Sequence, residues 1–272
     1  MPQFFLPADS EQNGKFHLRG PEAFHISRVL RYREGDPLVL FDGKGTRFEA
    51  VIGVIHPDGS VSGTIVSRKL ETAESVAARL NLYQGLLKSS HWEWLLQKGT
   101  EIGVSSFIPV TTPRTVVLLR EEERVKAKRE RWAKIVLAAA KQCGRADLPA
   151  VAEPVEFRDA IKASCGEAAL DDGTPAPPSP DRRITLVAWE GLAGATARRS
   201  VRDALLEAEV GEDRHGVTVD LFVGPEGGFS DEEIELAESM GAVVFGLGRS
   251  TLRGETAAIA AASLILYEFG AL

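Results

Sequence analysis

The sequence predicts an α/β protein in two parts, a small β-barrel over residues 1–72 and a larger parallel-sheet domain over residues 73–272. Short apolar stretches separated by Gly and Asp turns fill the first part, which is typical of a small barrel. From about residue 79, apolar strands alternate with helical stretches, as in a parallel sheet. The last fifth of the chain contains a strand, a glycine loop and a helix twice in succession, and this repeat predicts a ligand crevice.

The expected strands of the barrel are short and are joined by residues that favour turns. They cover residues 37–41, 47–54 and 61–66, with turns at 42–45 and 57–60. One amphipathic helix is expected before them, over residues 22–31. Its apolar side chains, Phe24, Val29 and Leu30, are expected to pack, and Arg28 and Arg31, three positions apart, can share a face.

The second domain is expected to follow a polar, alanine-rich linker at residues 71–79. Its strands are predicted at 79–85, 107–110 and 184–188, and its helices at 92–103, 121–142 and 195–209. Proline-rich residues 171–181 predict a surface loop rather than a domain boundary. Most charged side chains of residues 120–134 are expected on a solvated helix face. Cys143 is expected to be a buried small apolar residue, because no neighbouring His could activate it as a nucleophile.

The end of the chain carries two strand, loop and helix units. Residues 219–223 and 242–245 are expected strands. Ser230 followed by Glu233 has the spacing of a capping box, which predicts the start of the first helix, and Gly241 predicts its end. An alanine-rich helix is expected over residues 257–269, after a polar loop that ends at Thr256.

Two glycine loops at the carboxyl edge of a parallel sheet indicate a site where a ligand touches backbone. For either loop alone, a tight connection without a ligand is the more ordinary explanation. The spacing excludes the common nucleotide motifs, because Thr251 stands where a dinucleotide fingerprint needs its third glycine, and the chain has no phosphate-binding P-loop. Loops rich in backbone donors and poor in lysine suit a ligand without phosphates.

Five strings in order carry a resemblance to a known family. They are HISRVLR at residue 25, QKGTEIG at residue 97, QCGR at residue 142, GPEGG at residue 224, and LG with LRGETA at residues 247–257. In this respect the chain resembles the bacterial 16S rRNA N3-uridine methyltransferases, within the SPOUT superfamily. Where that family usually has a basic residue two positions before Leu252, this chain has Ser250, with Arg249 beside it.

The resemblance implies a PUA-like RNA-binding barrel followed by a SPOUT domain with a deep trefoil knot, which is an exception to the rule that chains are unknotted. It also implies that both glycine loops enclose S-adenosylmethionine. The residues expected to bind this cofactor are Gly224, Pro225, Gly227, Gly228, Leu247, Gly248, Leu252, Thr256 and Ala257. No metal is implied.

Three charged residues of these loops are the expected catalytic groups. Arg253 is expected to stabilise negative charge that develops on the uracil oxygens, since a guanidinium is always charged and offers several donors. Glu255 and Glu226 are candidates for the general base or for orienting Arg253, and a purely structural pairing is an open alternative.

The charge distribution allows a nucleic-acid partner although the net charge is −7. Residues 88–145 carry twelve basic and six acidic side chains, so a local basic patch is possible. The expected RNA contacts are Arg28, Arg31, Lys98, Arg114 and Arg145. For Lys98, a surface ion pair with Glu101 is an open alternative.

Composition and termini predict a cytoplasmic protein. The first ten residues lack the basic start and apolar core of a signal peptide, and the longest apolar run, residues 257–267, is too short to cross a bilayer. Two cysteines without metal-type spacing favour a reducing compartment. A homodimer is expected, because the resemblance places the cofactor loops against a partner subunit and the helix at 257–269 has a long apolar face.

The function predicted from the sequence is S-adenosylmethionine-dependent methylation of uridine N3 in 16S rRNA. Two alternatives stay open. One is ribose 2′-O-methylation of rRNA or tRNA, because the loops do not identify the acceptor atom. The other is a non-catalytic RNA-binding protein in which the glycine loops are only scaffold.

Overall fold

The computed structural model describes residues 2–70, 78–115, 122–166, 182–192, 199–208 and 216–272, without the side chains of residues 122–125. By its contacts the chain divides into two compact units. The first contains Met1–Ser75 and Leu137–Leu148, and the second contains Val76–Val136 and Pro149–Leu272. The segment Leu137–Leu148, expected in the larger domain, therefore belongs to the smaller unit. The polar linker (residues 71–77) and the proline-rich loop (171–181) lie outside the described residues.

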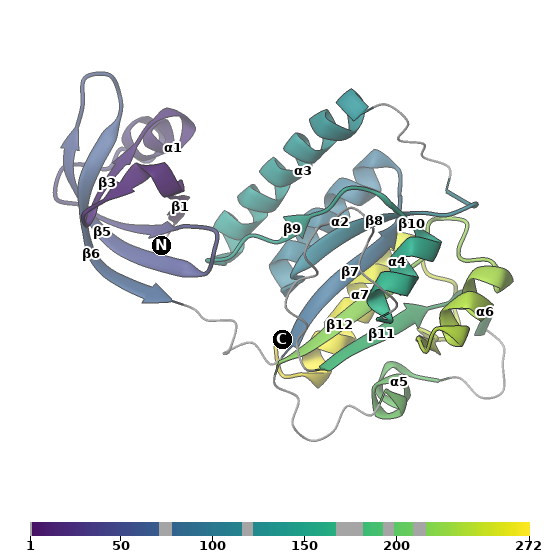
Figure 1. Ribbon diagram of the computed structural model, residues 1–272. Helices are drawn as coiled ribbons and strands as arrows, with labels where there is room; N and C mark the ends of the chain where they lie inside the picture. The colour runs from purple at the N-terminus through teal and green to yellow at the C-terminus, as the bar shows by residue number, and fades with distance from the viewer. Residues whose placement is uncertain (1, 71–77, 116–121, 167–181, 193–198, 209–215) are drawn as a thin grey trace. The chain divides into compact units, whose positions relative to one another are not determined.

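The first unit is a six-stranded sheet that curls into a half-barrel (Figure 1). The strand order is β1-β4-β5-β6-β3-β2, and every pair except β1 with β4 is antiparallel. The strands are β1 (Gln3–Phe5), β2 (Glu11–Gln12), β3 (Lys15–Leu18), β4 (Pro37–Phe41), β5 (Thr46–Ile55) and β6 (Val61–Leu70). A 3-10 turn, η1, covers Ala8–Ser10. The prediction of β4, β5 and β6 is confirmed, whereas β1 to β3 were not predicted.

The expected helix at residues 22–31 is wrong in detail. The structure has a short α-helix, α1 (Gly20–Phe24), followed by a π-helical turn, η2 (His25–Val29). Ala23 and Ile26 are the residues that pack on the sheet, whereas Phe24, Val29 and Leu30 are exposed. The π-turn changes the helical period, so an α-helical wheel assigns these side chains to the wrong face.

The second unit is built on a parallel sheet with the strand order β10-β8-β7-β12-β11-β13, and β9 also pairs with β8. Its strands are β7 (Ala78–Gly85), β8 (Ser106–Thr111), β9 (Ala150–Val151), β10 (Val155–Glu156), β11 (Arg182–Ala188), β12 (Val217–Val223) and β13 (Val243–Phe245). All seven residues of β12 are buried, as expected for a central strand with helices on both faces. The predicted strands at 79–85, 107–110, 184–188, 219–223 and 242–245 are confirmed to within two residues.

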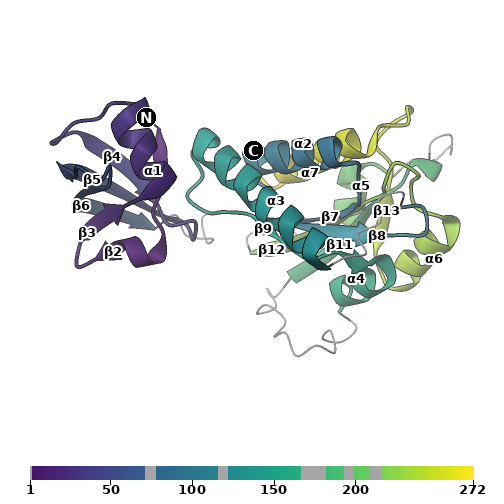
Figure 2. The same ribbon diagram turned by 90° about the horizontal axis from the view of Figure 1, so that it is seen from above.

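Helices cover both faces of this sheet (Figure 2). One face carries α2 (Ser89–Ile102) and α7 (Gly254–Glu268), and the other carries α4 (Phe157–Ser164). The remaining helices are α3 (Glu122–Cys143), η4 (Glu190–Leu192), α5 (Val201–Glu207) and α6 (Asp231–Ser239). Residues 195–198 and 209 of the helix expected at 195–209, and residues 120–121 of the expected charged face, lie outside the described part. No helix among the described residues is long and apolar enough to span a membrane.

The ends of the helices can be compared with the caps and boundaries predicted from the sequence. The capping box at Ser230 and Glu233 is present, and Gly241 follows α6 with a φ of +89°. The last helix begins at Gly254 rather than 257, so the expected polar loop is shorter and Glu255 and Thr256 lie in the first helical turn. Cys143 is exposed rather than buried, because it is the last residue of α3.

A row of polar side chains crosses the middle of the parallel sheet, where apolar residues are the rule. Thr185, Asp220, Asn81 and Ser106 occupy paired register positions on β11, β12, β7 and β8. Asn81 Nδ2 donates to Asp220 Oδ1 at 2.8 Å, and Ser106 Oγ donates to Asn81 Oδ1 at 2.6 Å. Ser106, Asn81 and Asp220 are thus linked by hydrogen bonds, and Thr185 joins them through Ser164, whose Oγ lies 2.6 Å from Thr185 Oγ1.

Asp220 is the centre of this row and is completely buried. Its Oδ2 accepts from Ser164 Oγ of α4 at 2.8 Å and from Arg183 Nη1 at 3.2 Å. Burial raises the pKa of the Asp220 carboxyl, and the nearby Arg183 guanidinium opposes that shift. Every polar atom of Asp220 is therefore satisfied in the folded protein.

Candidate active site

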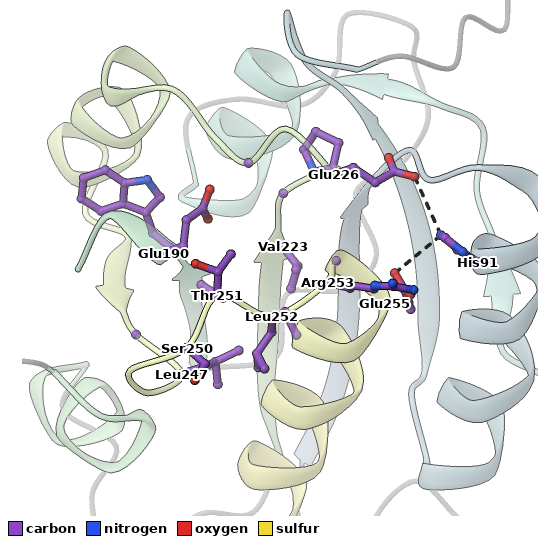
Figure 3. A pocket seen from close by; sticks show the side chains of 18 of the residues that line it. His91, Glu190, Val223, Glu226, Leu247, Ser250, Thr251, Leu252, Arg253 and Glu255 are labelled. Carbon is purple, nitrogen blue, oxygen red and sulfur yellow. Dashed lines mark ion pairs between the residues drawn. The ribbon is translucent and has the colours of Figure 1, made fainter. Parts of the chain in front are cut away.

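A cavity of about 350 Å³ lies at the carboxyl edge of the parallel sheet, beyond the ends of β7, β11, β12 and β13. Its walls are the loops after β12 and β13, the end of β11, and the first residues of α2 and α7 (Figure 3). The size is within the range of small-molecule sites. The adjacent order of β7, β12, β11 and β13 brings together loops that are far apart in the sequence.

The loop after β12 is held in place by close backbone contacts. A Cβ atom on Gly85 would overlap Pro225, and one on Gly224 would lie 3.0 Å from the backbone of Gly228. The buried side chain of Gln84 donates from Nε2 to the Gly224 carbonyl at 2.8 Å. Only glycine allows this packing, which leaves the backbone of the loop facing the cavity.

Two further side chains hold the same loop from outside. Arg114 Nη1 donates to the carbonyls of Gly227 at 3.2 Å and Phe229 at 3.0 Å. Gly228 has a φ of +68°, and a Cβ there would overlap the carboxylate of Glu190. The shape of the loop is thus specified by Arg114, Glu190 and the glycines together.

An acid–base cluster forms one wall of the cavity, and it consists of His91, Glu226 and Glu255 (Figure 3). His91 Nδ1 lies 3.9 Å from Glu226 Oε1 and 3.8 Å from Glu255 Oε2. Glu226 Oε1 also accepts from the backbone N–H of Lys88 at 3.1 Å. His91 Nδ1 and Glu255 Oε2 are buried, and neither has a hydrogen-bond partner in the described part of the chain. Leaving such an atom unpaired costs about 1–3 kcal/mol, which indicates a functional use of the cluster.

Arg253 is the cationic side chain next to this cluster (Figure 3). It is exposed at the N-cap position of α7 and lines the cavity. Within the described residues its guanidinium forms no hydrogen bond or ion pair, in contrast to the guanidinium groups of Arg114 and Arg145. Its guanidinium is therefore available to a ligand.

The residues of the cavity fit S-adenosylmethionine, which the sequence resemblance implies. The acidic lining side chains are Glu190, Glu226 and Glu255, and the lysine and arginine are Lys88 and Arg253. Three carboxylates against two such cations favour a ligand with positive charge, and this cofactor carries a sulfonium and an ammonium. Among the described residues no group of three or more His, Cys, Asp or Glu is placed to hold a metal ion.

The nearby N-terminus of α6 does not suit a phosphate. The capping box uses two of its backbone donors, the Ser230 N–H, which donates to Glu233 Oε2 at 2.8 Å, and the Glu233 N–H, which donates to Ser230 Oγ at 3.3 Å. Its first turn carries the acidic residues Asp231, Glu232 and Glu233. A negatively charged ligand would be repelled there, although helix N-termini often bind phosphate.

Most of the predicted site residues line the cavity. These are Gly224, Pro225, Glu226, Gly228, Leu247, Gly248, Leu252, Arg253, Glu255 and Ala257. Gly227 and Thr256 do not line it. Gly227 packs against Arg114, and Thr256 is exposed in the first turn of α7.

The expected RNA contacts lie in three settings. Arg28 and Arg31 are exposed on the first unit. Lys98 pairs with Glu101 at 2.9 Å, and Arg145 pairs with Asp147 at 2.6 Å. Arg114 holds the glycine loop from the second unit. A role in RNA binding stays a prediction for all five.

Several lining residues were not predicted, notably Lys88, His91, Trp189 and Glu190. They follow β7 and β11 in the chain. The rule that ligands bind beyond the carboxyl ends of parallel strands could have identified them.

Comparisons with known proteins agree with this architecture. Residues 74–266 match the family model described as an RNA methyltransferase domain, and residues 18–66 match an RNA methyltransferase PUA domain. The chain is 29% identical over 271 residues to the ribosomal RNA small subunit methyltransferase E of Bacillus subtilis, covering 98% of this chain and 97% of that one.

Solved structures give the same relationship. A ribosomal RNA small subunit methyltransferase E from Neisseria gonorrhoeae, bound to S-adenosyl methionine, superimposes with a TM-score of 0.74 and 26% identity over 98% of each chain. A methyltransferase from Legionella pneumophila in complex with SAM has a TM-score of 0.76 and 28% identity, over 98% of this chain and 97% of that one. The expected SPOUT fold with a PUA-like domain is confirmed. With a parallel-sheet domain that matches the family model over residues 74–266, this chain belongs to the RNA methyltransferase family.

Proposed function

We propose that this chain methylates N3 of a uridine in the 16S rRNA of the small ribosomal subunit, with S-adenosylmethionine as the methyl donor. The observation that carries the proposal is the cavity, in which an unpartnered arginine and an acid–base cluster stand beside a glycine loop. The names of the Bacillus and Neisseria relatives, both ribosomal RNA small subunit methyltransferases, support the substrate.

The donor supplies a methyl group activated on a sulfonium sulfur. The backbone of the loop after β12 and that of residues 246–248 would bind it, since these segments line the cavity. The carboxylates of Glu190, Glu226 and Glu255 favour its positive charge. This arrangement would hold the donor at the carboxyl edge of the sheet, where a base can approach. Orientation of the two reactants is a large part of such catalysis.

Uracil N3 lies on the base-pairing edge, so the target uridine must be unpaired or flipped out to react. N3 must also lose its proton as the methyl group moves. Negative charge then develops on the uracil oxygens, and the free guanidinium of Arg253 is positioned to stabilise it. Glu226 and Glu255 either take up the proton or set the orientation of groups that do.

The first unit contributes an RNA-binding surface in this proposal. Arg28 and Arg31 are exposed beside the exposed apolar residues Phe24, Val29 and Leu30. Arg28→Ala is expected to weaken binding to small-subunit rRNA uniformly and to reduce the salt slope by about one. Arg158→Ala, an exposed arginine on α4 of the other unit, is the control. Equal salt slopes for the two variants would show that Arg28 does not contact phosphate.

We further propose a homodimer in which α7 contributes to the interface. Leu264 is 49% exposed and Tyr267 is 66% exposed on this helix, three positions apart, and Leu206 of α5 is 64% exposed. An apolar surface of this kind is typical of an interaction site. Sedimentation at micromolar concentration is expected to give a dimer, and a fully active species of 29.4 kDa would contradict it.

A substrate within the ribosome places the reaction in the cytoplasm. The trefoil knot implied by the resemblance is also part of the proposal, since strand order and pairing alone do not define the path of the chain.

Mass spectrometry of rRNA nucleosides tests the proposed function in cells. Cells that lack this protein are expected to lose 3-methyluridine from 16S rRNA and to regain it when the parent gene is returned. Loss of a 2′-O-methyl nucleoside instead would favour the ribose reaction. An unchanged nucleoside profile would favour a non-catalytic RNA-binding protein.

A further inference from the structure

His91 is the one residue of the acid–base cluster that the sequence analysis did not select. It lies near the start of α2, after Ser89, and its ring faces both carboxylates of the cluster (Figure 3). The other members come from separate segments, Glu226 from the loop after β12 and Glu255 from the first turn of α7. Three separate parts of the fold thus meet at this imidazole.

The contacts of His91 are on one edge of its ring. Nδ1 is buried and lies within 4 Å of both carboxylates, at 3.9 Å from Glu226 and 3.8 Å from Glu255. The side chain as a whole is 37% exposed, so the accessible part is the remainder of the ring, on which Nε2 lies. In the described residues no hydrogen bond involves Nε2.

Two carboxylates on the Nδ1 side determine which nitrogen carries the proton. A carboxylate accepts hydrogen bonds, so a neutral imidazole between two of them carries its hydrogen on Nδ1. The lone pair of the ring is then on Nε2, the accessible atom. The same logic, with a carboxylate that holds the tautomer and stabilises the imidazolium, operates in hydrolase triads. Distances of 3.8–3.9 Å are longer than hydrogen bonds, but such contacts commonly shorten when substrate binds.

We propose that His91 is the general base for the methyl transfer, with Nε2 accepting the uracil N3 proton and with Glu226 and Glu255 as positioning residues. This inference rests on the proposed function. It assigns the role of proton acceptor to the His91 imidazole rather than to Glu226 or Glu255. Glu226 and Glu255 face Nδ1 rather than the accessible edge of the ring.

The step balances in atoms and electrons. The N3–H bond breaks and its proton moves to His91 Nε2, which becomes imidazolium. The electron pair of that bond stays on N3 and forms the new bond to the methyl carbon. The bond from that carbon to sulfur breaks, its electron pair stays on sulfur, and the product is S-adenosylhomocysteine. The imidazolium then returns its proton to water.

Several charged side chains share the cavity with His91. Lys88 on the same segment, Glu226, Arg253 and Glu255 all line the same cavity, as does Glu190 on the far wall.

A pair of substitutions separates a base from a structural bridge. His91→Asn keeps a donor near the position of Nδ1 and removes Nε2, and His91→Gln removes the donor to the carboxylates. Both variants are expected to lower the single-turnover rate about 100- to 10,000-fold. Glu93→Gln is the control on the same helix, because Glu93 pairs with Arg131 and does not line the cavity.

The outcomes distinguish the two proposals. A parent protein that forms no 3-methyluridine contradicts the proposed function. A parent that forms it, with His91→Asn at a parental rate, contradicts the base. Binding of S-adenosylhomocysteine, measured by calorimetry, is expected to change less than tenfold in His91→Asn, and a complete loss of binding would make His91 a cofactor ligand instead.

A second readout does not depend on activity. Nitrogen chemical shifts of the His91 ring, assigned by comparison with His91→Asn, are expected to show the tautomer with hydrogen on Nδ1 at high pH. Replacing both carboxylates, as Glu226→Gln with Glu255→Gln, is expected to reduce that preference. A parent protein with its hydrogen on Nε2 would overturn the assignment of the base.

Discussion

Two polar clusters of the second unit differ in how completely their atoms are paired. The row through Asn81, Asp220 and Thr185 lies in the middle of the sheet, and every polar atom of Asp220 has a partner. The cluster of His91, Glu226 and Glu255 lies at the carboxyl edge, and two of its buried atoms have no partner in the described chain. Both clusters combine carboxylates with polar or basic side chains, but the first lies on the strands and the second on the loop after β12 and on two helices.

This difference in pairing indicates which cluster stabilises the fold and which one serves the function. A buried network that is fully paired fixes the register of strands and helices and is strongly destabilised when one member is removed. A cluster with unpaired atoms is held in place by the surrounding fold, and its unpaired atoms can bind a ligand. We therefore expect substitutions in the row to change the free energy of unfolding, and substitutions at the edge to change binding and rate.

The largest effect is expected from Arg183→Met. This change leaves the buried carboxylate of Asp220 without its cation, at a cost of about 3–5 kcal/mol in the free energy of unfolding at neutral pH. The loss is expected to shrink at acid pH, where Asp220 is protonated. Denaturant titration at several pH values measures it, with Arg158→Met, an exposed arginine on α4, as the control. Similar stabilities for the two variants would contradict a structural role for the row.

Arg253→Ala, in contrast to Arg183→Met, is expected to change the reaction rate and not the stability. Removing this unpartnered guanidinium is expected to lower the methyl-transfer rate about 100- to 1,000-fold, because a donor to developing charge is lost. The free energy of unfolding is expected to change by less than about 0.5 kcal/mol. Arg249→Ala is the matched control, since Arg249 is exposed on the same loop but does not line the cavity. If Arg249→Ala lowers the methyl-transfer rate as much as Arg253→Ala does, the loss reflects the overall charge of the loop rather than a specific contact of Arg253.

Gly228→Ala is expected to change both quantities moderately. A side chain at a φ of +68° costs about 1–2 kcal/mol in stability, and its Cβ would displace Glu190. Affinity for S-adenosylhomocysteine, measured by calorimetry, is expected to fall at least tenfold. Gly166→Ala has the same strain, with a φ of +88° and open space around it, so it is expected to lose stability only. Unchanged affinity in Gly228→Ala would remove the loop from the cofactor site.

The smallest effect is expected from the pH dependence of Asp220→Asn. Burial raises the pKa of Asp220, so the folded state holds this proton more tightly than the unfolded state does. The free energy of unfolding of the parent, relative to the variant, is therefore expected to fall as pH rises through and above the ordinary range of an aspartate. A relative stability that rises with pH would mean that Arg183 and the hydrogen bonds dominate over burial.

Five strands of the second unit could be predicted from the sequence because local signals agree with the final packing, whereas β9, β10 and α4 were not predicted. The capping box at Ser230 and the apolar run of β12 act over a few residues. The π-turn at His25–Val29 could not be predicted, since its period follows from packing of Ala23 and Ile26 on the sheet.

The site was predictable where a loop carries an unusual composition. Arg253 and most of the loop glycines stand out in a single stretch of sequence, and they line the cavity, with Gly227 as an exception. His91 and Glu190 do not stand out, because each is one polar residue after an ordinary strand. Their proximity to the glycine loop depends on the order β7-β12-β11, which no local pattern contains.

Methyl transfer in a purified system tests the central claim most directly. Small ribosomal subunits from cells that lack this protein would be incubated with the protein and methyl-labelled S-adenosylmethionine, and the rRNA would then be digested to nucleosides. We expect label in 3-methyluridine with the parent and almost none with Arg253→Ala. Label in a 2′-O-methyl nucleoside, or no label in rRNA with a protein that binds S-adenosylhomocysteine, would contradict it.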